Sequence, residues 1–227
     1  NDKNMYSPED FHSLPFSIFP AGGVAIFFSE NAIGKVYQGG IPAMESELPM
    51  SYYTDGTQQG TKVLSQEGIY FRPCAIGNTL FLPRMKNLDV LHLDTGAFVH
   101  VKTLPGNAGG ILNLDGEIGS TAAGSKWLYF SYKTEEDGCE LWCSDGTNLG
   151  TKRVVDLFPG PESGTVGGTM DPNMPNTMTC CGNTVYFYGY TPAAGYELMK
   201  SDGTAAGTVC VADVYPGQES GVLAFSI

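Results

Sequence analysis

The chain has 227 residues, of which 30 are glycine and 14 are proline, so about a fifth of it consists of residues that break helices and form turns. This composition argues against a mainly helical protein. Hydrophobic residues make up 42% of the chain and charged residues only 16%. That is too much core-forming material for a disordered chain, so we expect an all-β protein with enough length to bury a sizeable core.

The charge balance narrows the set of partners. There are 12 Lys and Arg residues against 24 Asp and Glu residues, a net charge of −12, and no run of basic residues. Binding to the phosphates of a nucleic acid is therefore not expected. The longest apolar stretch, GVAIFF at residues 23–28, is far shorter than the roughly 20 residues that cross a bilayer, so no membrane insertion is expected. The start at Asn1 rather than Met indicates a processed or excised chain, for which secretion is one explanation.

Four aromatic or apolar strands are predicted along the chain, and each precedes a hairpin. The strands lie at residues 24–28, 78–82, 126–130 and 183–189. The hairpins read YYTDGTQQGTKVL at 52–64, VLHLDTGAFVHVKTLPG at 90–106, ELWCSDGTNLGTKRVVDLFPGPESG at 140–164 and ELMKSDGTAAGTVCVADVYPGQESG at 197–221. The last two segments are an internal repeat. The turn aspartates Asp55, Asp94, Asp145 and Asp202 are 39, 51 and 57 residues apart, a period typical of one supersecondary unit per repeat.

Each hairpin is predicted to turn at its Asp-Gly-Thr sequence, where Asp accepts hydrogen bonds from its own backbone and Gly supplies a positive φ. The turn residues are Asp55, Gly56, Thr57, Asp145, Gly146, Thr147, Asp202, Gly203 and Thr204. With a short strand before each aromatic strand, every unit has four antiparallel strands. We therefore predict an all-β, β-propeller-like fold of about four blades in one domain, residues 1–227. The approximate blades are 14–64, 65–104, 105–157 and 158–214.

The two long copies, ELWCSDGTNLGTKRVVDLFPG and ELMKSDGTAAGTVCVADVYPG, resemble the ELWxxDGT repeat of large secreted proteins with propeller-like architecture. The match is specific over about 50 residues in two copies and degenerate over the first 110 residues. The resemblance implies an extracellular, all-β repeat protein. It brings no established catalytic residue, so no site is transferred.

The tail at residues 215–227, YPGQESGVLAFSI, repeats the beginning of a blade. Its strand at 222–226 could complete the first blade of its own chain and close a ring, or complete a blade of a neighbouring chain by strand addition. The chain could equally be a piece of a longer propeller. The sequence leaves these three alternatives open.

Six cysteines are present, an even number: Cys74, Cys139, Cys143, Cys180, Cys181 and Cys210. Cys139 and Cys143 are four apart on one predicted strand, roughly 13 Å at about 3.3 Å per residue, which is too far for a mutual disulfide. We expect three disulfides with distant partners, which would place the protein outside the cytosol. Six buried thiols are the alternative, and zinc is disfavoured because ligand spacing is absent.

No catalytic or cofactor site is expected. The segment 119–126, GSTAAGSK, lacks the residue order of a phosphate-binding loop and precedes a strand. His12, His92 and His100 could each pair with a carboxylate, but nothing local in the sequence orients them. The acidic run 135–137 is interpreted as a solvated turn. Calcium could bind through Asp145, Asp156, Asp202 and Asp213, although a turn cap explains the first and third of these more simply.

These patterns favour a non-enzymatic, extracellular structural or adhesion protein that associates with itself or with a surface partner. Filament formation by strand exchange is one form of this hypothesis. A carbohydrate-binding propeller module is the alternative, because Tyr52, Tyr53 and Tyr190 could stack on sugars.

Overall fold

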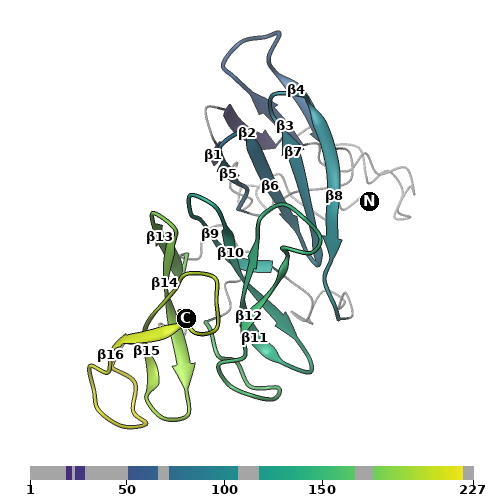
Figure 1. Cartoon of the computed structure of the whole chain (residues 1–227). Coiled ribbons are helices and arrows are strands. Elements are labelled where there is room, and N and C mark those ends of the chain that lie inside the picture. The colour runs from purple at the N-terminus through teal and green to yellow at the C-terminus, as the bar shows by residue number, and fades with distance from the viewer. Residues whose placement is uncertain are drawn as a thin grey trace, which may run out of the picture. The chain divides into compact units, whose positions relative to one another are not determined.

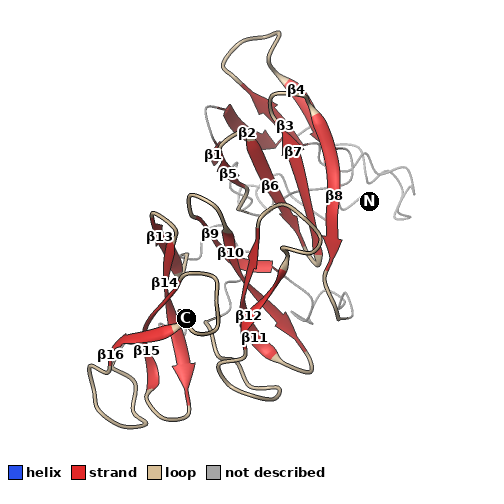
Figure 2. Cartoon of the chain, viewed as in Figure 1, coloured by secondary structure: helices blue, strands red, loops and turns tan. Residues whose placement is uncertain are grey.

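The computed structural model describes residues 19–21, 24–28, 51–65, 72–106, 118–166 and 176–221, and these residues form strands and turns without a helix (Figures 1 and 2). Within these ranges there is accordingly no helix that could cross a membrane. The chain divides into two compact units, residues 1–70 and 71–227, where the sequence analysis treated it as one domain. The tail strand expected at 222–226 lies outside the described residues.

The described strands form four sheets, each with four consecutive antiparallel strands. The first sheet contains β1 (Phe19–Ala21), β2 (Val24–Phe28), β3 (Ser51–Thr54) and β4 (Lys62–Ser65). The second contains β5 (Cys74–Ile76), β6 (Thr79–Arg84), β7 (Asn87–His92) and β8 (Ala97–Thr103). The third contains β9 (Ile118–Ala123), β10 (Leu128–Thr134), β11 (Gly138–Ser144) and β12 (Lys152–Val155). The fourth contains β13 (Met178–Cys181), β14 (Thr184–Thr191), β15 (Gly195–Ser201) and β16 (Val209–Ala212).

This arrangement confirms the predicted fold class, an all-β, propeller-like protein with four-stranded blades. The four sheets share one irregularity as well as one strand order. In each of them the register shifts between the third and fourth strands, as at Leu141/Trp142 in the third sheet and Leu198/Met199 in the fourth. A bulge at this place increases the local twist of the sheet.

Two apolar clusters hold the second unit together. One lies between the second and third sheets and includes Phe81, Phe130 and Trp142, with the ring centroids of the last two 6.3 Å apart. The other lies between the third and fourth sheets and includes Tyr129 and Phe187. The third sheet is therefore apolar on both faces, which explains why every residue of β11 is buried.

The Glu of each ELW-like segment fastens the loop that leaves its blade. Glu140 is buried, and its Oε2 and Oε1 accept hydrogen bonds from the backbone N–H groups of Leu157 (3.0 Å) and Gly164 (2.9 Å). Glu197 accepts one from the N–H of Gly221 (2.8 Å) in the same way. A β-carbon at Gly164 would collide with the Glu140 carboxylate. In both copies of the repeat, the Glu of the first strand therefore contacts the glycine that ends the ESG segment.

Candidate functional site

The Asp-Gly-Thr turns singled out in the sequence have one hydrogen-bond network in three places. In the third sheet, Oδ1 of Asp145 accepts from the N–H (2.9 Å) and the hydroxyl (2.7 Å) of Thr147. Gly146 has a φ of +87°, and Gly56 and Gly203 have φ values of +91° and +90°. The corresponding bonds recur between Asp55 and Thr57 and between Asp202 and Thr204.

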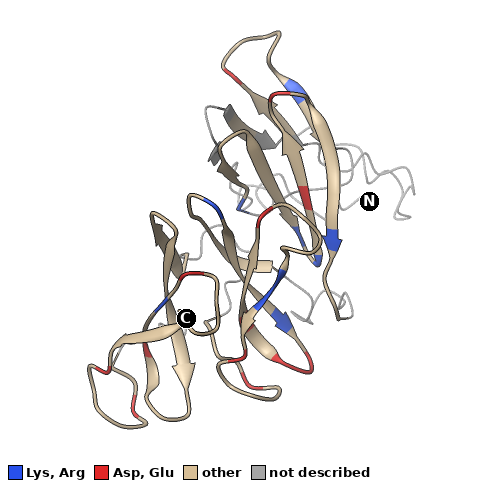
Figure 3. Cartoon of the chain, in the orientation of Figure 1, with Lys and Arg blue, Asp and Glu red and all other residues tan. Residues whose placement is uncertain are grey.

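All three aspartates are exposed, and at two of them the turn itself favours the ionised form. The threonine hydroxyl, followed by the threonine N–H, lowers the pKa of Asp55 and of Asp202 below the ordinary value. Figure 3 shows the acidic positions mainly in the turns that connect strands. Among the residues that the structure describes, no group of three or more His, Cys, Asp or Glu side chains could hold a metal ion. The calcium hypothesis therefore gains no ligand set from the described turns.

The expectation of three disulfides is wrong for this structure, in which all six cysteines are unpaired thiols. Sheet topology gives the reason for one pair: Cys181 on β13 and Cys210 on β16 lie on the two outermost strands of one sheet, at least about 14 Å apart at roughly 4.8 Å per strand, against about 7 Å for a disulfide. Burial raises the pKa of Cys139 and of Cys143 to about 11, so both thiols stay protonated and unreactive. The argument for an extracellular location thereby loses its cysteine support.

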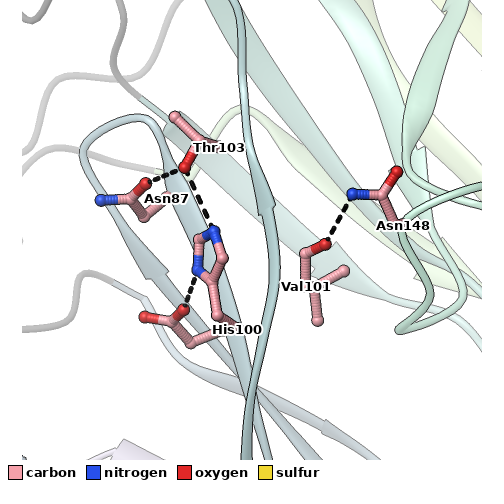
Figure 4. Close-up of polar contacts among 6 residues, drawn as sticks. Asn87, His100, Val101, Thr103 and Asn148 are labelled. Carbon is pink, nitrogen blue, oxygen red and sulfur yellow. Dashed lines mark hydrogen bonds and ion pairs between the residues drawn. The ribbon is translucent and has the colours of Figure 1, made fainter.

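A hydrogen-bonded array of carboxylate, imidazole and hydroxyl lies across β7 and β8 (Figure 4). The Oδ1 atom of Asp89 is 2.7 Å from Nδ1 of His100, and Nε2 of His100 is 3.1 Å from Oγ1 of Thr103. The Thr103 hydroxyl donates to Oδ1 of Asn87 (2.8 Å). Nothing near His100 in the sequence orients its side chain, and this array supplies the missing carboxylate.

The backbone places these side chains together. Asp89 faces His100 directly across the ladder, and Asn87 faces Thr103, with a register shift between Leu88 and Asp89. The side chain of Asp89 is 5% exposed and that of His100 is 54% exposed. The array therefore runs from a buried carboxylate to a solvent-facing imidazole and hydroxyl.

Strand β8 is anchored from its other side by the third sheet. The side-chain amide of Asn148 donates to the carbonyl of Val101 (3.0 Å), and Nζ of Lys102 donates to the carbonyls of Asn148 (3.2 Å) and Thr151 (2.7 Å). Figure 4 shows the first of these bonds beside the array. Two neighbours of His100 in the chain are thus fixed to a turn of the next blade.

The arrangement has the order of groups used to activate a hydroxyl: a buried carboxylate fixes one imidazole nitrogen, and the other nitrogen contacts the hydroxyl. With the Thr103 proton directed at Asn87, Oγ1 of Thr103 is the acceptor in its contact with Nε2 of His100. Rotation of the Asn87 amide by half a turn reverses the chain of donors, so that Thr103 donates to Nε2.

A second His–Thr contact on the same sheet lacks this organisation. Nδ1 of His92 is 3.4 Å from Oγ1 of Thr79, also across a strand ladder. The described contacts of His92 include no carboxylate. His12 lies outside the described residues.

Comparisons with known proteins give structures but no family. No family model matches the chain, and no curated protein matches it. The ELWxxDGT resemblance therefore stays a prediction. Similar solved structures include a Mycobacterium tuberculosis puromycin-hydrolyzing peptidase (15% identity, TM-score 0.49, covering 86% of this chain and 28% of that one). Others are a puromycin hydrolase (14%, 0.48, 83% and 27%) and a Pyrococcus horikoshii acylaminoacyl peptidase (12%, 0.48, 86% and 27%).

These proteins are hydrolases and peptidases, whereas the sequence analysis expected a non-enzymatic structural or adhesion protein, with a carbohydrate-binding module as its alternative. That expectation is corrected. The chain spans little more than a quarter of the length of these structures. At such low identity and TM-score the likeness itself assigns no activity to this chain.

Proposed function

We propose that the second sheet carries a hydroxyl-activating site and that the protein hydrolyses small esters or amides. One observation carries the proposal: the continuous array from Asp89 through His100 to Thr103, with contacts of 2.7 and 3.1 Å. Both distances lie within the range of hydrogen bonds that pass a proton between a nucleophile and its base.

The proposed reaction begins with Thr103 donating its hydroxyl hydrogen bond to Nε2 of His100. As Oγ1 attacks a substrate carbonyl, the proton passes to Nε2, and the Asp89 carboxylate stabilises the resulting imidazolium. The protonated imidazole then gives this proton to the leaving alcohol or amine, and an acyl ester remains on Thr103. Water, deprotonated by the same nitrogen, hydrolyses that ester and regenerates the hydroxyl.

Asn87 sets which of two states the site adopts. Its carbonyl oxygen holds the Thr103 proton away from His100, whereas its amide NH₂, turned toward Oγ1, leaves that proton free for Nε2. Replacing Asn87 by Asp fixes an acceptor at this place. We expect Asn87→Asp to lower the rate while leaving the strand ladder unchanged.

The test is hydrolysis of p-nitrophenyl acetate by the full chain and by Thr103→Val, which removes the hydroxyl and keeps the branched shape. We expect a loss of about 100-fold in kcat/KM. Mass spectrometry of the acid-quenched wild-type reaction should find an acetyl group on the peptide that contains Thr103. The matched control is Thr79→Val, which removes the hydroxyl of the His92 contact and should leave the rate unchanged. Equal rates for wild type and Thr103→Val would overturn the proposal.

A further inference from the structure

The fourth sheet exposes the face that its counterpart in the third sheet buries. Val154 on β12 is 8% exposed, because the fourth sheet covers it. Val211, the residue at the same place of the repeat, is 44% exposed. Tyr129 is fully buried, and its counterpart Tyr186 is partly exposed. The same positions are thus core in one blade and surface in the next.

The connection that leaves each blade shows the same contrast. Leu157 packs into the cluster between the third and fourth sheets, and the ring of Phe158 stacks on that of Tyr190 with centroids 5.0 Å apart. Their repeat counterparts, Val214 and Tyr215, are 63% and 55% exposed. A single exposed valine or tyrosine is unremarkable, but here four positions whose counterparts are covered in the third sheet are exposed together.

The connection out of the third sheet is also fixed by its backbone. Thr165 forms a β-bridge with Gly189 on β14, and the N–H of Tyr190 donates to the carbonyl of Gly164 (2.7 Å). A β-carbon at Gly189 would collide with Met199 and crowd Phe187, and it would lie in contact with Leu157. The fourth sheet therefore contacts the connection from the third sheet through a glycine, Gly189, and the aromatic residue that follows it, Tyr190.

In the fourth sheet, one buried carboxylate oxygen lacks the hydrogen bond that holds the outgoing connection in the third sheet. In the third sheet both carboxylate oxygens of Glu140 accept a backbone hydrogen bond, one of them from Leu157. In the fourth, Glu197 is 1% exposed, its Oε1 accepts from Gly221, and its Oε2 is buried without a hydrogen-bond partner. The repeat counterpart of the missing donor is the N–H of Val214. A buried carboxylate oxygen without a hydrogen-bond donor lowers the stability of the fold. The site would therefore be satisfied if the connection after β16 packed against Glu197 as its counterpart packs against Glu140.

We propose that the outer face of the fourth sheet, defined by Tyr186, Tyr188, Val211, Val214 and Tyr215, binds a further four-stranded blade of the same repeat. The proposal extends an interface already present between the third and fourth sheets. The incoming blade presents an apolar first face, a glycine at the place of Gly189 and an aromatic residue at the place of Tyr190. Its docking presses Val214 toward Glu197 and stacks its aromatic ring on Tyr215.

The test adds a second copy of the fourth blade to the end of the chain. Because Gly221 corresponds to Gly164, residues 165–227 can be repeated directly after Gly221 without changing the connection that joins two blades. We expect the extended chain to be monomeric and its melting temperature to lie roughly 5 °C above that of the unextended chain, as each added interface stabilises a repeat array. Amide hydrogen exchange should slow at Val214 and Tyr215 of the original copy.

The matched control carries Val211→Lys and Val214→Lys in the original copy. Charged groups at the buried interface should abolish both the rise in melting temperature and the slowed exchange. An added blade that leaves exchange at Val214 and Tyr215 unchanged would overturn the proposal.

The same double substitution in the unextended chain identifies any other occupant. If the face is free for a further blade, the substitution changes the melting temperature by less than about 1 °C. A fall of several degrees would mean that the face is already covered, and would also overturn the proposal. Light scattering would then show whether a second copy or another part of the same chain covers it.

Discussion

At the scale of single residues, the buried Glu140 shows how one residue of a short motif contacts residues far along the chain. Glu140 stabilises its blade by accepting N–H groups that lie 17 and 24 residues further along the chain. Burial is the largest influence on its carboxyl group and raises the pKa to about 7, although the two backbone hydrogen bonds act in the opposite direction. The ionised form is therefore less favoured in the folded chain than in the unfolded chain.

A pH dependence of stability follows from this raised pKa. Between the ordinary value of 4.5 and about 7, the folded chain binds more protons at Glu140 than the unfolded chain does. The contribution of this group to the free energy of unfolding is therefore full below about pH 4.5 and is lost as pH rises toward 7 and above. Urea denaturation from pH 4.5 to 8.5 should show this decline. Glu140→Gln should remove it, and a parallel decline in both proteins would contradict the assignment.

Residue-scale interpretation of the sequence was least successful where two strands had to be aligned. Asp89 sits in the apolar run NLDVLH and gives no sign of its partner, because its pairing with His100 depends on a register shift at Leu88. The alternation of strand residues cannot locate a bulge. The carboxylate–imidazole pair was therefore beyond sequence reasoning, whereas the turn aspartates, whose partners are two residues away, were not.

At the scale of elements, the spacing within each turn has a steric explanation. In the sequence Ser-Asp-Gly-Thr-x-x-Gly-Thr the second glycine lies against the carboxylate of the aspartate, so that a β-carbon at Gly150 would collide with Asp145. The Gly150 N–H in turn donates to the Thr147 hydroxyl (3.0 Å). The turn closes around its aspartate, and this local closure made the repeat recognisable in three of the four sheets.

This geometry predicts a coupling between two positions of one turn. Gly150→Ala should lower the free energy of unfolding by about 1–3 kcal/mol, because the new methyl group displaces the Asp145 carboxylate. Asp145→Ala removes the obstacle. In the double variant the two losses should therefore fall short of additivity by about 1 kcal/mol or more. Leu149→Ala, at a side chain that is 93% exposed, is the control and should be neutral. Strict additivity in chemical denaturation would contradict the steric account.

At the scale of the whole molecule, contacts between neighbouring blades stabilise the repeats. The sequence predicted the number of strands in each sheet, because aromatic strands and turns alternate along it. It did not predict how the blades are fastened, because a carbonyl 54 residues away carries no local signal: the Tyr129 hydroxyl donates to the backbone carbonyl of Asn183 (2.9 Å). Burial accordingly raises the pKa of Tyr129 well above its ordinary value.

The Tyr129 bond gives a prediction that separates a covered blade from an uncovered one. Tyr129→Phe removes one buried hydrogen bond between the third and fourth sheets and should lower the free energy of unfolding by about 1–2 kcal/mol, since the Asn183 carbonyl is left without its donor. Tyr186→Phe makes the same chemical change at the equivalent position of the fourth sheet. That ring is partly exposed, and we expect a loss below about 0.5 kcal/mol. Urea denaturation of the two variants at one pH compares them directly. Equal losses would mean that the fourth sheet is covered as the third is, because the Tyr186 substitution can remove a buried hydrogen bond only if another blade supplies the acceptor.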